Sequence, residues 1–457
     1  MTRPNVLFIP VDDLRPQLGC YGRSQMKTPH MDRLAAEGTV YENAYCQVPV
    51  CGASRASLLS GLRPTRTRFV DFLAAVDEDM PGALTLPEHF RHCGYETVSV
   101  GKVFHHNHDT GRRSWTREPW HPAQPTGGAP RGGRWRNYLT PEAQAQARAD
   151  GKSGPPFECA EVMDNAYHDG QIADRAIHEL SRMRGSDRPF FLAAGFLKPH
   201  LPFNAPKKYW DLYREGDLSL ADNPFAPENA PSQALHNSGE LRNYFDVPKQ
   251  GPLPESLQRQ LVHGYYAATS YVDAQIGRVL RALEDFQFAD HTIVCLWGDH
   301  GWQLGEHGMW CKHCNFETSL NAPMIFRVPG QKPERRSRAI VEFLDIFPTL
   351  CDLADLSIPT HLHGTSLAST IEDEQARVKH AAYSRWYAGE SIRTENYLYT
   401  QWTRPDGAEE SCMLFDHDAD PDENVNIATD ARHADRIERY NEMLARTRAE
   451  AEAAGVD

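Results

Sequence analysis

Cys51 opens an apolar run and is followed four residues later by Arg55, in the sequence Val-Pro-Val-Cys51-Gly-Ala-Ser-Arg55-Ala-Ser-Leu-Leu. A small-residue turn before an apolar helix puts Cys51 at the helix N-terminus, where free backbone N–H groups and the helix dipole stabilise an anionic sulfur or oxygen. The simpler interpretation is a buried structural cysteine beside a solvated arginine, because free cysteine is among the most buried residue types. Cys51 by itself leaves both interpretations open.

Four short β-rich runs end in polar residues. In an open, mostly parallel sheet, catalytic groups collect beyond the carboxyl ends of the strands. The four ends therefore predict one shared site. The runs and the residues that follow them are Val6–Val11 with Asp12 and Asp13, Thr97–Val100 with Lys102 and His105, Phe190–Ala194 with Lys198 and His200, and Thr292–Trp297 with Asp299 and His300.

The two aspartates at the first strand end indicate a bound cation. Asp12 and Asp13 are costly side by side unless a positive ion neutralises them, although a solvated loop pair is the alternative. Asp299 and His300 repeat the pattern, and with Cys51 these residues describe a site for one divalent metal. Oxygen ligands favour Ca²⁺, which we predict; Mg²⁺ and, through His300, Mn²⁺ are the alternatives.

Cations and proton donors come from separate segments of the chain. Lys102, His105, His200 and Lys312 suit a site that grips a tetrahedral oxyanion and protonates a leaving oxygen. The run His105-His106-Asn107-His108 could instead be a transition-metal cluster, but it lacks Cys or Asp partners at ligand spacing. Cys311 and Cys314 suggest zinc or redox chemistry, but no second Cys pair and no thioredoxin-like context accompany them.

The remaining patterns indicate how the chain is organised. Helix signals cover about 29–37, 86–93 and 256–286, and the apolar stripe of the last one is typical of core packing. Residues from 106 to about 164 are rich in Gly, Pro, Arg and Trp and predict an irregular surface insertion that forms a lid or a subunit contact. We expect an α/β catalytic domain over 1–370 with a large mixed, mostly parallel sheet flanked by helices. A smaller α+β domain over 371–457 is expected to have antiparallel strands and a terminal helix.

Composition excludes several classes of function. The chain has 457 residues, a net charge of −14 and 40% hydrophobic residues, which speaks against nucleic acid or an acidic membrane as a partner. Arg-Gly and Trp interleaving near 127–136 can mark RNA binding, but no known RNA-binding module accompanies it. The first residues lack a secretory signal and no run reaches membrane-spanning length. Ten scattered cysteines fit reduced thiols, so we expect a cytoplasmic enzyme.

These residues together resemble the sulfatases of the alkaline-phosphatase superfamily. The resemblance runs from about residue 5 to 415, with a further match to the family's C-terminal signature at 414–426. Within the family it is similar to the iduronate-2-sulfatases. The motifs that carry it are Asp12-Asp13, Cys51-Gly52-Ala53-Ser54-Arg55, Gly101-Lys102, Lys198-Pro199-His200 and the run from Gly298 to Gly308.

The resemblance implies a mechanism for these residues. Cys51 would be oxidised to formylglycine by the formylglycine-generating enzyme, and the hydrated aldehyde would be the nucleophile that attacks sulfur. Arg55 and Lys102 would hold it, and His105 would deprotonate the second hydroxyl to expel sulfate. Lys102, His200 and Lys312 would bind the sulfate. His200 and Lys312 would also protonate the leaving alkoxide.

Two departures from the family pattern bear on function. The usual motif has Pro where this chain has Ala53, and an unconverted thiol would be a poor nucleophile at sulfur. After Asp71 and Phe72 the iduronate enzymes carry an aromatic and basic segment, whereas this chain continues into the acidic residues 77–79. We therefore expect a small sulfate ester, including aryl sulfates, rather than a sulfated uronate.

Other readings of the site remain open. A phosphonate monoester or phosphodiester hydrolase of the same superfamily is the rival enzyme, because a tetrahedral anion of either element fits one cationic grip. A catalytically silent binding or scaffold protein that keeps the fold is the rival from another class. A homo-oligomer is compatible with the sequence.

Overall fold

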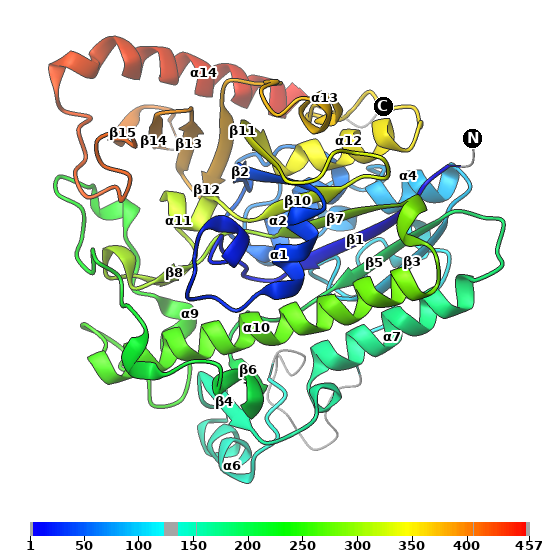
Figure 1. Cartoon of the computed structure of the whole chain (residues 1–457). Helices are drawn as coiled ribbons and strands as arrows, with labels where there is room; N and C mark the ends of the chain where they lie inside the picture. The colour runs from blue at the N-terminus through cyan, green and yellow to red at the C-terminus, as the bar shows by residue number, and fades with distance from the viewer. Residues whose placement is uncertain (1–2, 123–135, 152, 405, 454–457) are drawn as a thin grey trace.

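A seven-stranded sheet forms the centre of the molecule (Figure 1). The computed structural model describes residues 3–122, 136–151, 153–404 and 406–453. Each strand runs parallel to its neighbours except β10, which is antiparallel to both β2 and β7. This is the large mixed, mostly parallel sheet that the sequence predicts. In spatial order the strands are β11 (Arg335–Glu342), β2 (Thr39–Tyr45), β10 (Met324–Arg327), β7 (Thr292–Gly298), β1 (Asn5–Val11), β5 (Phe190–Gly195) and β3 (Glu96–Gly101).

Helices cover both faces of the sheet. The side chains of β1 point alternately to the two faces, and every residue of this strand is buried, so both faces need a covering layer. Leu7 and Ile9 pack in one buried cluster, beneath α1 (Pro29–Ala36), α7 (His168–Met183) and α10 (Glu255–Asp285). The apolar stripe predicted on α10 is buried from Leu261 to Leu283. From Val272 onward it packs in this cluster, and its earlier residues pack in a neighbouring one. The fold is therefore a three-layer α/β arrangement.

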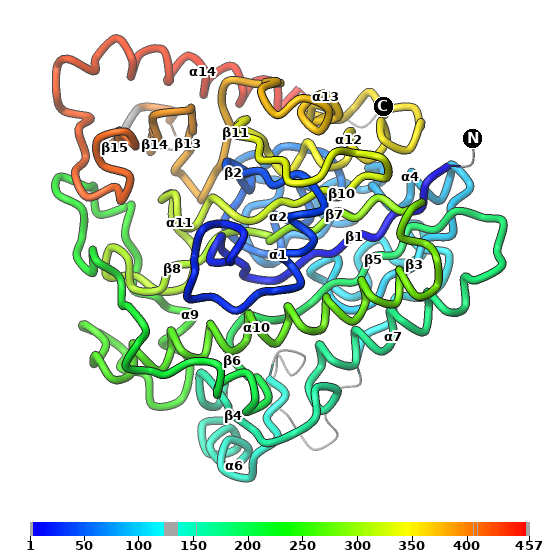
Figure 2. The backbone as a smooth tube through the Cα atoms, in the orientation of Figure 1, coloured from blue at the N-terminus to red at the C-terminus, as the bar shows by residue number. Residues whose placement is uncertain are grey.

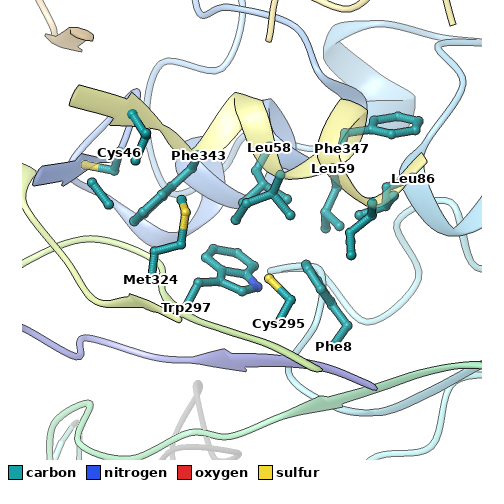
Figure 3. Close-up of a cluster of buried hydrophobic side chains, with 14 of the residues drawn as sticks. Phe8, Cys46, Leu58, Leu59, Leu86, Cys295, Trp297, Met324, Phe343 and Phe347 are labelled. Carbon is teal, nitrogen blue, oxygen red and sulfur yellow. The ribbon is translucent and has the colours of Figure 1, made fainter. Parts of the chain in front are cut away.

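The opposite face carries the helix that begins at Cys51. Here Phe8 packs with Trp297 and with residues of α2 (Cys51–Ser60), α4 (Leu86–His92) and α12 (Ile346–Leu353), as Figure 3 shows. Every residue of α2 is buried. The helix ends at Gly61, whose φ of 71° closes the last turn in a left-handed conformation. A helix enclosed in this way holds its first residue, Cys51, in a fixed position at the end of the sheet.

A smaller antiparallel sheet follows in the C-terminal part of the chain. Its strands lie in sequence order, and α14 (Ala434–Ala453) packs across it before ending near α13 (Ala368–Glu372) (Figure 2). Arg68 Nη2 donates to the carbonyl of Ala451 at 2.6 Å, which ties the end of α14 to the larger part. A domain boundary near residue 370 stays a prediction. The strands are β12 (Ala382–Trp386), β13 (Gly389–Arg393), β14 (Tyr397–Thr403) and β15 (Glu409–Asp416).

The segment 106–164 contains more regular structure than its sequence predicts. It includes α5 (Gly111–Ser114), α6 (Pro141–Asp150) and β4 (Phe157–Ala160), and β4 pairs in parallel with β6 (Phe203–Pro206). The N-cap of α6 is Thr140, whose hydroxyl accepts from the Ala143 amide at 3.2 Å, and alanines favour the helix that follows. The Gly- and Arg-rich run considered for RNA binding lies outside the described residues, apart from Arg136.

Short elements complete the described part of the chain. None of its helices has the length and apolar character needed to span a bilayer. The short elements used below are α3 (Val76–Asp79), α9 (Gly239–Arg242), β8 (Gln303–Leu304), β9 (Trp310–Cys311) and α11 (Glu317–Leu320).

Candidate active site

The carboxyl ends of β1 and β7 lie side by side and bring the predicted acidic residues together. The register pairs Val11 with Gly298, so the residues that follow each strand emerge at the same edge of the sheet. The backbone amide of Asp13 donates to Asp299 Oδ1 at 2.9 Å. Asp13 has a φ of 58°, a left-handed conformation that Asp tolerates better than most residues. This turn aims two carboxylates into one buried space.

Cys51 and His300 meet in this space. Cys51 Sγ lies 3.2 Å from His300 Nε2 and 3.6 Å from Asp13 Oδ1. The other ring nitrogen, Nδ1, donates to the Gly301 carbonyl at 2.8 Å, since a carbonyl can only accept. In neutral His300 the Nε2 lone pair is therefore free to act as a ligand, and the hydrogen bond at Nδ1 fixes the ring.

Two overlapping groups of side chains could hold a metal ion. In each group the potential ligand atoms all lie within 4.8 Å of one another, and Asp13 and Cys51 belong to both. Together the two groups offer three carboxylates, two imidazoles and one sulfur atom, a donor set that a divalent cation would complete. The first group is Asp12, Asp13, Cys51 and His200, and the second is Asp13, Cys51, Asp299 and His300.

Arg55 reaches the same edge of the sheet from inside α2. Its Nε donates to Asp299 Oδ2 at 2.9 Å and its Nη2 to Asp12 Oδ1 at 3.1 Å, and its side chain is completely buried. The spacing from Cys51 to Arg55 is one helical turn, so both residues lie on the same side of α2. One guanidinium thus locks the two strand ends to the helix that carries Cys51.

Lys102, which directly follows β3, contacts Asp12. Its Nζ lies 2.5 Å from Asp12 Oδ2. The close approach of β3 and β5 at this point requires glycine: a Cβ on Gly195 would lie 2.0 Å from the Lys102 carbonyl oxygen. Gly101 also has a φ of 76°, which turns the chain so that Lys102 can follow. The sequence signal Gly101-Lys102 therefore has a backbone cause.

The electrostatics of the site are uneven. Burial would raise the pKa of Asp12, but Lys102 and Arg55 outweigh burial and hold that pKa well below its usual value. Burial raises the pKa of Asp13 well above its usual value, and the nearby Asp12 raises it further despite Lys312. Burial also raises the pKa of the Cys51 thiol. The site therefore stabilises charge on Asp12 and disfavours it on Asp13 and Cys51.

Lys312 and His200 are two further basic side chains near Asp13. Lys312 Nζ lies 3.0 Å from Asp13 Oδ1, and His200 Nε2 lies 3.9 Å from Asp13 Oδ2. Burial and the Lys312 charge lower the pKa of His200 well below its usual value. Burial disfavours the charge of Lys312, but Asp13, Cys51 and Glu240 together outweigh burial and raise the pKa of that amine. Lys312 therefore provides the fixed positive charge beside Asp13.

Two residues beside Lys312 were missed by the sequence analysis. Glu240, in α9, lies 3.0 Å from Lys312 Nζ and 3.3 Å from His200 Nε2. Trp302 lies with its ring centroid 4.8 Å from Lys312 Nζ, a cation–π contact. Nothing in the local sequence marks Glu240, because a short helix far along the chain brings it here. Trp302 falls inside the Gly298–Gly308 motif, which could have indicated it.

His105 lies three residues beyond Lys102 in the segment that follows β3. Its ring centroid is 4.8 Å from that of His106, and its Nδ1 atom is buried. Among the described residues, no candidate metal-binding group includes His105, His106 or His108, which argues against a transition-metal cluster there. Cys311 and Cys314 likewise belong to no such group. Cys314 Sγ contacts Ser319 Oγ at 3.1 Å and Gln303 Nε2 at 3.3 Å.

The acidic residues 77–79 are engaged in local structure. Asp77 forms an ion pair with Arg113 at 2.8 Å and accepts from the Thr110 amide at 2.9 Å. Asp79 accepts from the Phe69 amide at 2.9 Å. Two of the three acidic side chains that distinguish this segment therefore serve to hold α3 in place.

The chain is similar to known proteins over most of its length. The family model described as Sulfatase matches residues 4–356, and one described as N-sulphoglucosamine sulphohydrolase, C-terminal, matches residues 305–450. Iduronate 2-sulfatase from Homo sapiens is 37% identical over 394 residues, which cover 78% of this chain and 70% of that protein. Arylsulfatase from Clostridium perfringens is 28% identical over 471 residues, covering 97% of this chain and 94% of that protein.

Solved structures show the same fold. The phosphonate monoester hydrolase of Agrobacterium radiobacter superposes with a TM-score of 0.79 at 22% identity. The match covers 98% of this chain and 96% of that one. At this identity the likeness concerns the fold alone.

Proposed function

The chain belongs to the sulfatase family, and from this premise we propose that it hydrolyses a small sulfate monoester with Cys51, converted to formylglycine, as the nucleophile. The observation that carries the proposal is the meeting of Cys51 Sγ with His300 Nε2 at 3.2 Å, at the N-terminus of a helix whose Arg55 binds Asp12 and Asp299. The raised pKa of the thiol supports conversion, because a buried neutral thiol is a poor nucleophile.

The donor set fits one divalent cation, which we propose to be Ca²⁺. Asp12, Asp13, Asp299 and His300 would hold it, together with residue 51. Carboxylates dominate the set, and oxygen donors are the ligands that Ca²⁺ prefers. When bound, such an ion polarises oxygen atoms and offsets the charge of the buried carboxylates.

The residues around the metal-donor set would position the strand ends, bind sulfate and transfer protons. Lys102 and Arg55 hold Asp12 ionised and keep the strand ends in register with α2. Lys102, Lys312 and His200 would bind sulfate oxygens, and the last two would deliver a proton to the leaving alcohol oxygen. His105 would accept the proton whose removal frees the sulfate.

The alcohol half of the ester is proposed to be small. The family relatives include proteins named for aryl and for iduronate substrates, so the fold leaves this choice open. The lack of the basic segment after Phe72 favours a neutral or cationic ester over a sulfated uronate. Phosphonate monoesters remain the second candidate, because the phosphonate monoester hydrolase fold covers nearly the whole chain.

Two measurements test the proposal. The peptide that contains Cys51, from protein made with a formylglycine-generating enzyme, should be lighter than the encoded peptide and should react with carbonyl reagents. In parallel, kcat/KM is compared for an aryl sulfate, an aryl phosphonate monoester and a 2-O-sulfated uronate disaccharide. We expect the aryl sulfate to be preferred. A fully active protein with an unmodified thiol would contradict the nucleophile, and preference for the phosphonate would favour the second candidate.

The remaining proposals concern the context of the enzyme. We propose a cytoplasmic location, a formylglycine-generating enzyme as the maturation partner, and a homo-oligomer as one assembly state. Cell fractionation, co-expression with and without the maturation enzyme, and light scattering test these three in turn.

A further inference from the structure

Three aromatic rings lie in contact one after the other next to Lys312, and the last two, Trp386 and Tyr387, meet edge to face at an interplanar angle of 65°. The ring centroids of His313 and Trp386 are 5.0 Å apart with an interplanar angle of 30°, and those of Trp386 and Tyr387 are 4.4 Å apart. Tyr387 is 54% exposed, while His313 and Trp386 are half-buried. We name His313, Trp386 and Tyr387 the aromatic shelf. A cluster of rings that is partly open to solvent can serve as a binding surface.

The shelf joins the two parts of the molecule next to the site. His313 directly follows Lys312, whereas Trp386 and Tyr387 lie where β12 turns into β13; Figure 1 shows these strands near α11, the helix that follows His313. The Arg385 amide donates to the Gln47 carbonyl at 2.8 Å, four residues before Cys51. Asn315 Nδ2 donates to Ser391 Oγ at 2.9 Å. The hairpin is therefore anchored both to the segment that leads into Cys51 and to the segment that carries Lys312.

The backbone on both sides of the shelf is strained. Cys311 and His313 each have a φ of 78°, and Tyr387 has a φ of 47°. In a two-residue hairpin loop, Gly, Asn or Asp usually takes a positive φ, yet here a tyrosine does. Such conformations are costly for residues with a large side chain and cluster at functional sites. The strain indicates that the positions of these rings are selected for something other than stability.

The rings are suited to a neutral partner. Burial and the adjacent Lys312 lower the pKa of His313 well below its usual value, so its imidazole is an uncharged ring at neutral pH. Lys312 already has Trp302 as its cation–π partner. The shelf consequently offers uncharged ring surfaces that begin at the residue next in the chain to Lys312, the residue that would meet the leaving oxygen.

We infer that the aromatic shelf binds the aromatic ring of the alcohol half of an aryl sulfate. This inference rests on the proposed function, in which Lys312 contacts the ester at the leaving oxygen. A ring attached to that oxygen extends away from the sulfur, and the shelf starts at the next residue after Lys312. A substrate ring that packs face to face on one of Trp386 and Tyr387 and edge to face against the other would orient the ester before sulfur is attacked. The C-terminal sheet thus contributes to substrate selection.

The experiment compares an aryl sulfate with a short alkyl sulfate in Tyr387→Ala and Trp386→Leu. The ratio of kcat/KM for the aryl ester to that for the alkyl ester is expected to fall about five- to tenfold in each variant. Tyr387→Phe keeps the ring and should keep the wild-type ratio. Ile358→Ala is the matched control, since Ile358 is an exposed apolar side chain, 43% accessible, that follows α12.

A binding measurement separates this inference from the proposed function. In Cys51→Ala protein, calorimetry with 4-nitrophenyl sulfate should give a Kd that rises about five- to tenfold when Tyr387→Ala is added. If the protein with Cys51 intact cleaves neither ester but this rise in Kd is found, the binding role of the shelf is supported and the proposed chemistry fails. An unchanged aryl-to-alkyl ratio, or an equal dependence on Tyr387 for a sulfate ester that carries a quaternary ammonium in place of the ring, would overturn the aromatic assignment.

Discussion

Two clusters of acidic and histidine side chains in this protein have similar composition but differ in how their charges are balanced. The metal-donor cluster (Asp13, Cys51, Asp299, His300) and the junction cluster (Glu317, His417, Glu423) each bring three or more potential ligand atoms within 4.8 Å of one another. Arg393 completes the junction cluster: its Nε donates to Glu317 Oε2 at 2.9 Å and its Nη2 to His417 Nδ1 at 2.7 Å. His417 Nε2 then donates to Glu423 Oε1 at 2.9 Å.

The pKa directions separate the two clusters. Burial would raise the pKa of Glu317, but Arg393 and His417 together outweigh burial and lower it. Burial raises the pKa of Asp13, and Asp12 raises it further. In the junction cluster the positive partners hold Glu317 ionised, whereas in the metal-donor cluster Asp13 remains costly to ionise even with Lys312 at 3.0 Å. The set of residue types therefore does not define a metal site; the charge that remains to be balanced does.

The largest expected effect is at Asp299. Replacing it with alanine removes a proposed metal ligand and leaves Arg55 without one of its two carboxylates. We expect Asp299→Ala to lose bound metal and to reduce kcat/KM by about a thousandfold or more. Metal analysis and aryl sulfate turnover measure this, with Glu317→Gln as the matched carboxylate control. Full activity after exhaustive chelation would refute a metal role.

Arg393→Ala tests the junction cluster. The change leaves the Glu317 carboxylate buried without its guanidinium, so we expect unfolding to become easier by about 3 kcal/mol, with metal content unchanged. Denaturant unfolding measures the difference. Arg338→Ala is the control, because Arg338 is 78% exposed and its pair with Glu42 should contribute little. A loss of metal in Arg393→Ala would mean that the two clusters are coupled.

The pH dependence of metal binding follows from Asp13. A metal binds the carboxylate, and the pKa of Asp13 is raised, so affinity should weaken as pH falls through that pKa, by up to about tenfold per pH unit. Calcium titrations from about pH 8 to about pH 5 measure the slope. Glu317→Gln should keep the same slope, because the lowered pKa of Glu317 leaves it ionised over this range. A flat profile would place Asp13 outside the binding site.

The smallest expected effect is on the stability of the metal-free protein. The folded-state pKa of Asp13 is raised, so its contribution to stability is present at low pH and is lost as pH rises through that pKa. Asp13→Asn should therefore stabilise the metal-free protein by about 1 kcal/mol at neutral pH, while it abolishes metal binding. Glu317→Gln should destabilise, since the contribution of a lowered acid is present above its unfolded pKa. Thermal melts in chelator compare the two variants. Destabilisation of similar size in Asp13→Asn and Glu317→Gln would show that Lys312 already compensates the negative charge of Asp13.

Local patterns in the sequence accounted for the parts of the fold that local forces control. The four strand ends, α2 with Cys51 and the apolar stripe of α10 all lie where the periodicity and polar boundaries place them. The helix α6 was missed, because the preceding Gly- and Arg-rich residues obscured its Thr140 cap and its alanines. Glu240 could not have been found, since its contacts with Lys312 and His200 join segments far apart in the chain.

The family, the strand-end residues and the nucleophile candidate could be predicted from the amino-acid sequence, because each depends on a short run of residues with the spacing of one helical turn or one strand. Which charges are balanced depends on long-range contacts and could be seen in the folded structure alone. Arg393 completes one acidic cluster and Trp386 stacks on His313, in both cases through side chains more than 70 positions away in the chain. Such contacts depend on how β12 and β13 dock against the segment from Lys312 to Glu317, and no local pattern encodes that docking.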